Sequence, residues 1–407
     1  MSIKCDSKLL VKPLFFLVIV DTINGFFLNK GMESPIGIIF KAFILLVAFK
    51  MLCSFPRFRG LLFFTTIYIP TFLILVILNT DSQVGATINH LLKFVNVVFI
   101  YYAAVIVFKS EGIQTKNVEL IFCINSIVLL LNIYSGLLGI GYYAYGEGGG
   151  CKGFIYAHNE MSGMQAVLYG VSYYFIYNRY ASRKIILLIV NLFFLMAALL
   201  VTTKAGILLV LISLILVPFV HMQSGVFRSF LKMSKIKFLV LFSVICLISY
   251  YGYSLLDYSG AIDRWTYFFD KDGVNAIYSS RDTFWEEEKI EWEEGNIWIK
   301  LFGMGGARTV EMDQADALLN YGIVGVIIVY SFYLSLIVKA FRYRKKSQYA
   351  KFVLGMDIFI LAASCFAGHL LFSGLMGIPF ALMNALIFSP KMETVGGIES
   401  RYCNCKN

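Results

Sequence analysis

Charged residues are scarce in this chain of 407 residues: they make up 15% of it, whereas a soluble domain carries roughly 25%. Apolar residues make up 59%. They form repeated runs of about 20 residues, each long enough to cross a bilayer core as a helix. The runs do not alternate in polarity as membrane barrel strands do. The shortage of charge therefore excludes a soluble domain and predicts an all-α polytopic membrane protein.

Other absences exclude further classes. The first apolar run has no Ala-x-Ala cleavage site and is interrupted by Asp21, so we expect a retained helix rather than a signal peptide. Of eight cysteines, only Cys151 falls clearly in a segment expected outside the cell, so we expect no external disulfide. The glycines at 146–153 lack the spacing of a phosphate-binding loop, and we interpret 142–159 as a flexible loop with aromatic anchors.

Twelve helices are predicted to cross the membrane. Their ranges are 13–28, 34–50, 61–79, 86–108, 118–141, 160–177, 185–201, 205–220, 238–256, 317–338, 352–370 and 373–389. With the N-terminus inside, most Lys and Arg fall in cytoplasmic segments, as the positive-inside rule expects. This placement accounts for the net charge of +10 without a nucleic-acid partner. The chain then forms a single integral membrane domain, 1–407, with extracytoplasmic loops at 142–159 and 257–316.

The loop 257–316 is the only long hydrophilic segment, and it contains all four tryptophans. Its acidic residues outnumber its basic ones, and many of them cluster at 286–294. This cluster could hold a cation. Because Trp285 and Trp292 are seven residues apart on one helical face, we favour an amphipathic interfacial helix instead. The glycines at 303–306 indicate a bend.

Three of the ionisable residues inside predicted spans are singled out because charge is costly there. They are Asp21, Lys41 and Lys93. Lys41 and Lys93 could form a basic cavity open to the outside that receives an anionic lipid head group. Alternatively each side chain reaches the membrane surface, or Asp21 pairs with one of them. His90 lies three residues before Lys93 on the same helical face, which favours a pocket there.

Two short segments place polar groups at predicted outer helix ends. In the stretch 157–163, His158 and Asn159 are candidate site residues, although Asn159 could simply cap the helix. In the turn 202–206, Lys204 is either a diphosphate-binding cation or an anchor at the lipid head groups.

Three motifs occur in a fixed order. They are Thr-Thr-Lys-Ala-Gly at 202–206, Ser-Ser-Arg-Asp-Thr-Phe-Trp at 279–285, and Glu-Met-Asp at 311–313 leading into Tyr-Gly-Ile-Val-Gly at 321–325. In this order the chain resembles the O-antigen ligase and Wzy-type polymerase superfamily over roughly residues 155–340. The resemblance implies a C-type glycosyltransferase-like bundle of the twelve helices. By this resemblance, Lys204 corresponds to a basic residue with which a helix begins in the family. Arg281 corresponds to an arginine that precedes a tryptophan in the family's large external loop.

One departure from that family separates polymerases from ligases. Ligases that transfer glycan to the lipid A core resemble one another in having a histidine in this loop. It lies about eleven residues before the glycine pair of the next helix. Here Glu311 stands at that distance from Gly322, and the loop 257–316 contains no histidine. The resemblance therefore implies a repeat-unit polymerase, in which Glu-x-Asp is a familiar variant.

The implied reaction joins oligosaccharides carried on polyprenyl diphosphate, outside the bacterial cytoplasmic membrane, for O-antigen, capsule or exopolysaccharide. Glu311 or Asp313 would act as the general base. Arg281, Lys204 and Arg308 would bind the diphosphate. No cofactor or metal is expected. The implied partners are the lipid-linked oligosaccharide, membrane lipid, a flippase and a chain-length regulator.

Rival functions remain open. A ligase-like transferase would move glycan to another acceptor, and a flippase would transport the same lipid-linked units. Many transporters have two related halves, but no internal repeat is visible here, which weighs against a flippase. A membrane scaffold without chemistry is a further alternative.

Overall fold

The structure is a computed structural model that describes residues 3–79, 84–110, 115–145, 149–221, 252–254, 256–260, 262–263, 266, 281–306 and 308–389. In these residues seven helices are long and apolar enough to cross a membrane, or eight if a bent pair counts as one span. This confirms a polytopic helical membrane protein. The total of twelve spans stays a prediction. Most of the expected helix 238–256, and the part of the large loop at 267–280, lie outside the described residues.

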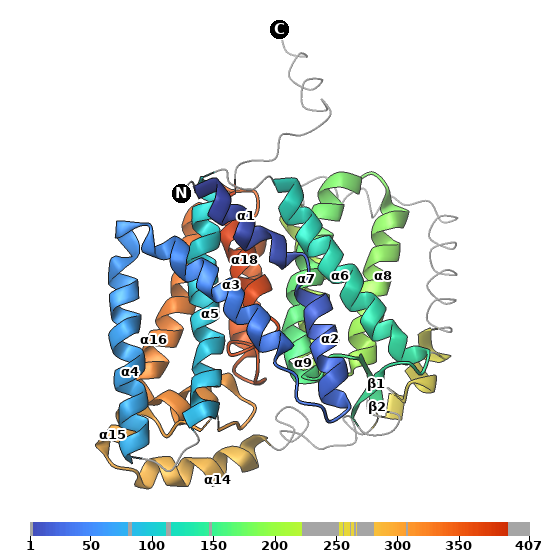
Figure 1. The fold of residues 1–407 in the computed structure, drawn as a ribbon. Helices are drawn as coiled ribbons and strands as arrows, with labels where there is room; N and C mark the ends of the chain where they lie inside the picture. Colours follow the sequence, from blue (N-terminus) through green and yellow to red (C-terminus); the bar gives the residue numbers. More distant parts are fainter. Residues whose placement is uncertain are drawn as a thin grey trace.

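Eight helices follow the predicted spans within a few residues. They are α3 (Ile36–Cys53), α4 (Arg59–Asn79), α5 (Val84–Lys109), α6 (Thr115–Leu137), α7 (His158–Tyr180), α8 (Lys184–Val201), α9 (Lys204–His221) and α16 (Asp313–Tyr343). Figure 1 shows them running roughly alongside one another as a bundle.

The elements of the two predicted loops gather at one end of this bundle, the lower end in Figure 1, which is called the loop end below. They are α14 (Arg281–Glu294), α15 (Ile297–Phe302), β1 (Tyr142–Tyr145) and β2 (Gly149–Gly153).

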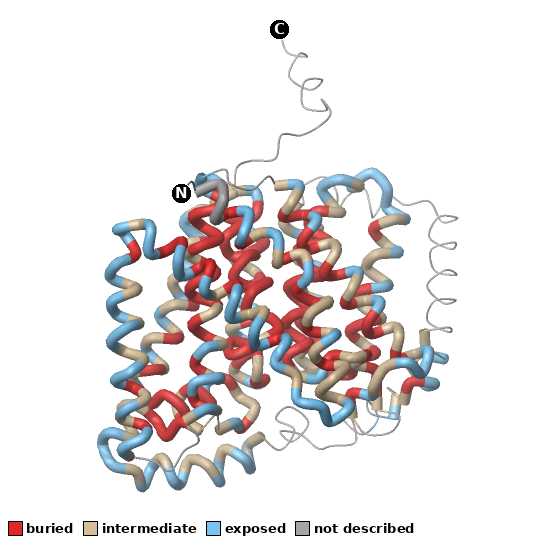
Figure 2. The backbone as a smooth tube through the Cα atoms, viewed as in Figure 1, coloured by how far each residue is buried: buried red, intermediate tan, exposed pale blue. Residues whose placement is uncertain are grey.

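Helix α5 is central and α4 is peripheral. Of their most apolar windows, 78% is buried in α5 but only 11% in α4. Figure 2 shows the same contrast, with buried residues concentrated in the middle of the bundle. Since α4 exposes apolar side chains such as Phe63 and Ile67 along its length, its outer face is suited to lipid.

The first predicted span is broken into α1 (Ile3–Leu14) and α2 (Leu17–Asn29), whose axes differ by 54°. Pro13 lacks an amide hydrogen and clashes with the preceding turn, which explains why the helix stops there. The buried Asn125 of α6 bridges the break: its amide donates to Leu14 O at 2.8 Å and its oxygen accepts from Val18 N at 2.9 Å. Helix α2 thus forms most of the predicted helix 13–28, while the first residues of that range belong to the end of α1 and to the break.

The last two predicted helices are much shorter than expected. They are α17 (Ala350–Ala363) and α18 (Gly377–Ala385), with a 3₁₀ turn η2 (Leu386–Phe388) after α18. Between them lies the irregular stretch 364–376, called the linker segment below, which is largely buried. Its apolar composition suggested helix, but buried irregular backbone is stable where other groups bond its amides, and here side chains do so.

The loop 142–159 contains a β-hairpin, so the structure is not purely helical. Strand β1 pairs antiparallel with β2. Asn132 of α6 holds the hairpin: it donates to Lys152 O at 3.1 Å and accepts from Phe154 N at 2.9 Å. Gly153 has a positive φ of 63°, and a Cβ there would lie 2.0 Å from Asn132 O. Glycine is required for this close approach of β2 to α6. The stretch was expected to be a flexible loop, but strands β1 and β2 pair within it.

Candidate functional site

Three residues other than glycine have a positive φ in the described part of the chain: Thr202 (59°), Glu311 (58°) and His369 (64°). This conformation is uncommon for such residues, and a β-branched threonine is an outlier there. Strained backbone of this kind concentrates at functional sites. The turn at Thr202 and the other two residues all lie near the first two turns of α7, which marks that place as the candidate site.

Glu311 lies where three distant segments meet. Its Oε2 accepts from Arg281 Nη2 at 3.2 Å, and its Oε1 lies 3.5 Å from Asn159 Nδ2, 152 residues away along the chain. Arg281 also donates through Nη1 to Phe366 O of the linker segment at 2.6 Å. A Cβ at Gly368 would lie 2.6 Å from Glu311 Cα, so only glycine lets the linker segment pass this closely. The structure thus brings together Arg281, Glu311 and Asn159, three of the candidate site residues.

Asp313, the second predicted base, is placed differently. It is 1% exposed, and its Oδ2 accepts from the amides of Leu370 and Leu371 at 3.0 and 2.8 Å. Its carboxylate therefore holds backbone of the linker segment. Glu311 is better placed than Asp313 to meet a substrate, because its side chain is 37% exposed.

Glu160 of α7 holds the linker segment at a second point, and the sequence analysis did not select it. Its Oε2 accepts from Ser373 Oγ at 3.1 Å and from the amides of Gly374 and Leu375 at 2.6 and 3.1 Å. Without Asp313, the buried amides of Leu370 and Leu371 would lose their acceptor, at a cost of roughly 1–3 kcal/mol each. Glu160 adds an acceptor for the part-buried Gly374 amide and for Leu375 N, which can also donate to Ser373 Oγ at 3.2 Å. Glu160 is thus a structural anchor beside the site.

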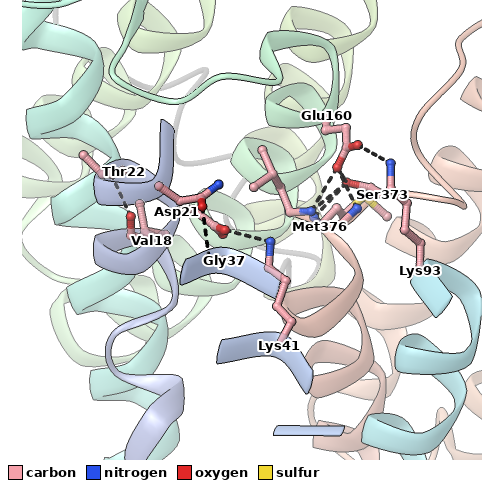
Figure 3. Close-up of polar contacts among 12 residues, drawn as sticks. Val18, Asp21, Thr22, Gly37, Lys41, Lys93, Glu160, Ser373 and Met376 are labelled. Carbon is pink, nitrogen blue, oxygen red and sulfur yellow. Dashed lines mark hydrogen bonds and ion pairs between the residues drawn. The ribbon is translucent and has the colours of Figure 1, made fainter. Parts of the chain in front are cut away.

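Two ion pairs lie next to this anchor (Figure 3). Lys41 Nζ and Asp21 Oδ1 are 2.7 Å apart, as are Lys93 Nζ and Glu160 Oε1. Both pairs border Gly374, since a Cβ there would lie 3.8 Å from Lys93 Cε and 3.9 Å from Lys41 Nζ. The alternative in which Asp21 pairs with a membrane lysine is therefore confirmed. Lys93, a candidate site residue, is neutralised by Glu160 rather than free to bind an anion.

His158 and Asn159 line an open pocket of about 400 Å³ at the loop end. The residues around it are Ala144, Lys152, Tyr156, Ala157, His158, Asn159, Glu160 and His369. The His158 ring meets the Tyr145 ring edge-on, with centroids 4.6 Å apart. The residue before α7 is Ala157, and no side chain caps the helix. The alternative in which Asn159 only caps α7 was wrong.

Lys204 is half-buried at the first position of α9. The turn before it packs between α7 and the hairpin: Thr203 Oγ1 lies 2.7 Å from Ser162 Oγ of α7, and a Cβ at Gly150 would lie 2.7 Å from Thr202 Oγ1. The turn that carries Lys204 therefore adjoins α7 one turn from Glu160. Its two proposed roles, diphosphate binding and anchoring, both stay predictions.

Arg308 has partners of its own. Its Nη1 lies 2.7 Å from Glu288 Oε2 and 2.7 Å from Glu291 Oε2, and its Nη2 donates to Glu291 Oε1 at 2.8 Å. Burial lowers the pKa of Arg308, but the hydrogen bonds and charges of Glu288 and Glu291 outweigh that effect and raise it overall. A diphosphate would have to displace two carboxylates to reach Arg308.

The acidic stretch 286–294 belongs to α14, which crosses the loop end in Figure 1. Trp285 and Trp292 turn toward the bundle and pack against a small buried cluster of Met304, Val310 and Leu319. This packing explains the spacing of the two tryptophans and fits an amphipathic helix. Its location at a membrane surface stays a prediction.

Within the residues described, no group of three or more His, Cys, Asp or Glu side chains could hold a metal ion. The expectations of no metal and no cofactor stay predictions. No protein-family model matches the sequence, and no curated protein matches it. The fold defines the class as a helical, polytopic membrane protein with a polar site at one end. Its activity is argued below from that site.

Two site residues escaped the sequence analysis. Glu160 stands in the polar stretch at 157–163, but nothing in the sequence shows its partners in the linker segment. His369 falls in an apolar stretch predicted as the end of a helix. A Gly-His pair at 368–369 near Ser373 and Gly374 is the one signal that could have indicated irregular backbone there.

Proposed function

We propose that this protein is a polysaccharide repeat-unit polymerase of the bacterial cytoplasmic membrane, which joins oligosaccharides carried on polyprenyl diphosphate. The observation that supports this most is the meeting of Arg281, Glu311 and Asn159 beside an open pocket. A glycosyl transfer from a lipid diphosphate needs a cation for the leaving group, a base for the acceptor hydroxyl and room for a sugar. This place offers all three.

In this mechanism Arg281 binds the diphosphate. Its Nε is buried without a hydrogen-bond partner among the described residues, so one of its donors is unsatisfied within the protein. When the diphosphate engages Arg281, it competes with Glu311 for the guanidinium and frees that carboxylate. Arginine suits this exchange because its planar fork forms two parallel bonds to phosphate oxygens.

Glu311 then takes the proton of the acceptor hydroxyl. The hydroxyl oxygen forms a bond to the anomeric carbon of the donor sugar, and the bond from that carbon to the diphosphate oxygen breaks. Polyprenyl diphosphate leaves with the bonding electron pair, its charge balanced by Arg281, with Lys204 as a further cation. The proton passes from Glu311 to water.

In this proposal the chain crosses the membrane twelve times, and the loop end lies outside. A flippase delivers the lipid-linked units to that side, and a chain-length regulator acts on the growing polymer. The arrangement also suits a ligase-like transferase, which would use the same donor with another acceptor.

Purified protein in detergent or nanodiscs, given only lipid-linked repeats, tests the proposal. A polymerase lengthens them into a ladder of products on the lipid. If repeats are consumed only when a different acceptor is added, the protein is a ligase. If repeats cross a vesicle bilayer without being joined, it is a transporter, and the polymerase proposal fails.

A further inference from the structure

The pocket beside α7 has a composition unlike that of an anion site. Among the described residues that line it, Lys152 is the one lysine or arginine, and its Nζ is 3.4 Å from Tyr156 O and 5.5 Å from the centre of the Tyr156 ring. The pocket's carboxylate, Glu160, is shared with Lys93. The remaining polar groups come from His158, Asn159 and His369. Uncharged donors and acceptors beside an aromatic ring suit a sugar, whose hydroxyls bond in both directions and whose apolar face packs on rings.

Glu311 contacts Arg281 and a residue of the pocket lining through different carboxylate oxygens. Asn159 lines the pocket and faces Glu311 Oε1, whereas Arg281 approaches Glu311 Oε2 and does not line the pocket. The Arg281 cation and the pocket, whose lining includes Lys152 and the paired Glu160, therefore reach this carboxylate through different atoms. A two-substrate transfer requires this division, because the diphosphate of the donor and the hydroxyl of the acceptor must reach the base from different directions.

His369 is held in the pocket wall by its neighbours on both sides. Its backbone is left-handed, with a φ of 64°. The amides of the next two residues are fixed by Asp313, and Gly368 before it packs on Glu311. Because the backbone of His369 is strained and held on both sides, its ring is pre-organised in the pocket wall.

The charge state of His369 also suits a neutral ligand. Burial lowers the pKa of His369, the carboxylates of Glu160 and Glu311 oppose that shift, and Lys93 and Arg281 add to it. The imidazole is then uncharged at neutral pH. It can both donate and accept a hydrogen bond.

We infer that the pocket lined by Tyr156, His158, Asn159 and His369 is the acceptor subsite, which binds the non-reducing terminal sugar of the second lipid-linked repeat with its reactive hydroxyl toward Glu311. Its volume of about 400 Å³ lies in the range of small-molecule sites, which runs from about 300 to 1,000 Å³. The inference rests on the proposed function, since it assigns the two substrates of that reaction to the two oxygens of one carboxylate.

The test uses the repeat-unit oligosaccharide released from its lipid by mild acid, so that it has neither lipid nor diphosphate. Its affinity for the full-length purified protein is measured by calorimetry. His369→Gly is the main variant, because glycine accepts the left-handed backbone without strain. His221→Gly is the matched control: it removes a histidine from the last position of α9, at the end of the bundle opposite the loop end. Tyr156→Ala, at an exposed position, guards against a folding defect in the linker segment.

We expect His369→Gly and Tyr156→Ala each to weaken oligosaccharide binding about tenfold and to raise the acceptor KM with little change in the donor KM. His221→Gly should match the wild type. Inorganic pyrophosphate should not displace the oligosaccharide.

Unchanged affinity in both pocket variants, in a protein that still polymerises, would overturn the acceptor subsite and leave the proposed function standing. Displacement by pyrophosphate would make the pocket the diphosphate site and overturn the assignment. Oligosaccharide binding that depends on His369 in a protein that joins no repeats would instead contradict the polymerase proposal and leave a sugar-binding pocket.

Discussion

Two arginines at the loop end each pair with glutamate, but their surroundings differ. Arg308 bonds to Glu288 and Glu291, which are 20 and 17 residues away, and its guanidinium has two carboxylate partners. Arg281 bonds to Glu311 and to the carbonyl of Phe366, 85 residues away, and its Nε has no partner among the described residues. Both ion pairs join parts of the loop 257–316, but Arg281 also reaches the linker segment through Phe366.

The sequence alone does not distinguish the surroundings of these two arginines. Both arginines belong to one acidic loop, and both are plausible diphosphate ligands by residue type. Only the Arg281 pair adjoins an open pocket, a strained Glu311 backbone and a segment held by buried carboxylates. We therefore assign the chemistry to Arg281 and Glu311 and treat the Arg308 pairs as a clamp between α14 and the chain before α16.

The largest loss of stability is expected where the scaffold of the Arg281 pair is removed. Glu160→Gln breaks the ion pair with Lys93 and leaves that charge poorly compensated, which typically costs about 3–5 kcal/mol in a buried pair. Glu288→Gln, in the clamp, is the matched control and should cost less than about 1 kcal/mol. Thermal unfolding of the purified variants measures both. Equal decreases in unfolding temperature for the two variants would show that the scaffold around Glu160 and the clamp around Arg308 contribute equally to stability.

The next largest effect concerns the arginine itself. Arg281→Lys keeps the charge but loses the planar fork, so two-point contact with the diphosphate is lost. Hydrogen bonds to charged groups are worth about 1.5–3 kcal/mol, which predicts roughly 10- to 100-fold slower chain elongation. The rate of polymer formation from lipid-linked repeats measures this. A variant as fast as the wild type would show that only charge is needed there.

Arg308→Lys is the counterpart in the clamp and should have a small effect. Because its partners are partly exposed, the change should cost no more than about 1 kcal/mol of stability. Elongation should stay within about twofold of the wild type, measured in the same assay. A loss as large as that of Arg281→Lys would place Arg308 on the diphosphate and break the comparison.

The sequence predicted most of the helices because apolar length alone sets them, and it selected Arg281 and Glu311 through their motifs. It could not predict features created by contacts between distant segments. The apolar stretch at 364–376 was expected to be mostly helical, and its irregular path depends on Glu160 and Asp313. Likewise, the membrane lysines Lys41 and Lys93 were visible in the sequence, but which acid each one pairs with was decided by packing.

The smallest effect is expected from metal removal. The acidic face of α14 would be a site rather than a surface only if it held a cation, and Glu288 and Glu291 already have Arg308 as a partner. Excess chelator should therefore leave elongation unchanged within error, with untreated protein as the control. Activity that disappears with chelator and returns with magnesium or calcium would instead indicate that the acidic face of α14 binds a cation needed for the reaction.

The central claim is that Glu311 is the base of a chain-elongating transfer, and chain length reports on it most directly. Purified Glu311→Gln and Glu288→Gln proteins, matched in amount and folding, are given the same lipid-linked repeats. Removing a general base typically slows a reaction by about 10² to 10⁴-fold. We expect Glu311→Gln to leave single repeats on the lipid while Glu288→Gln forms long chains. Wild-type chain lengths from Glu311→Gln would contradict the account.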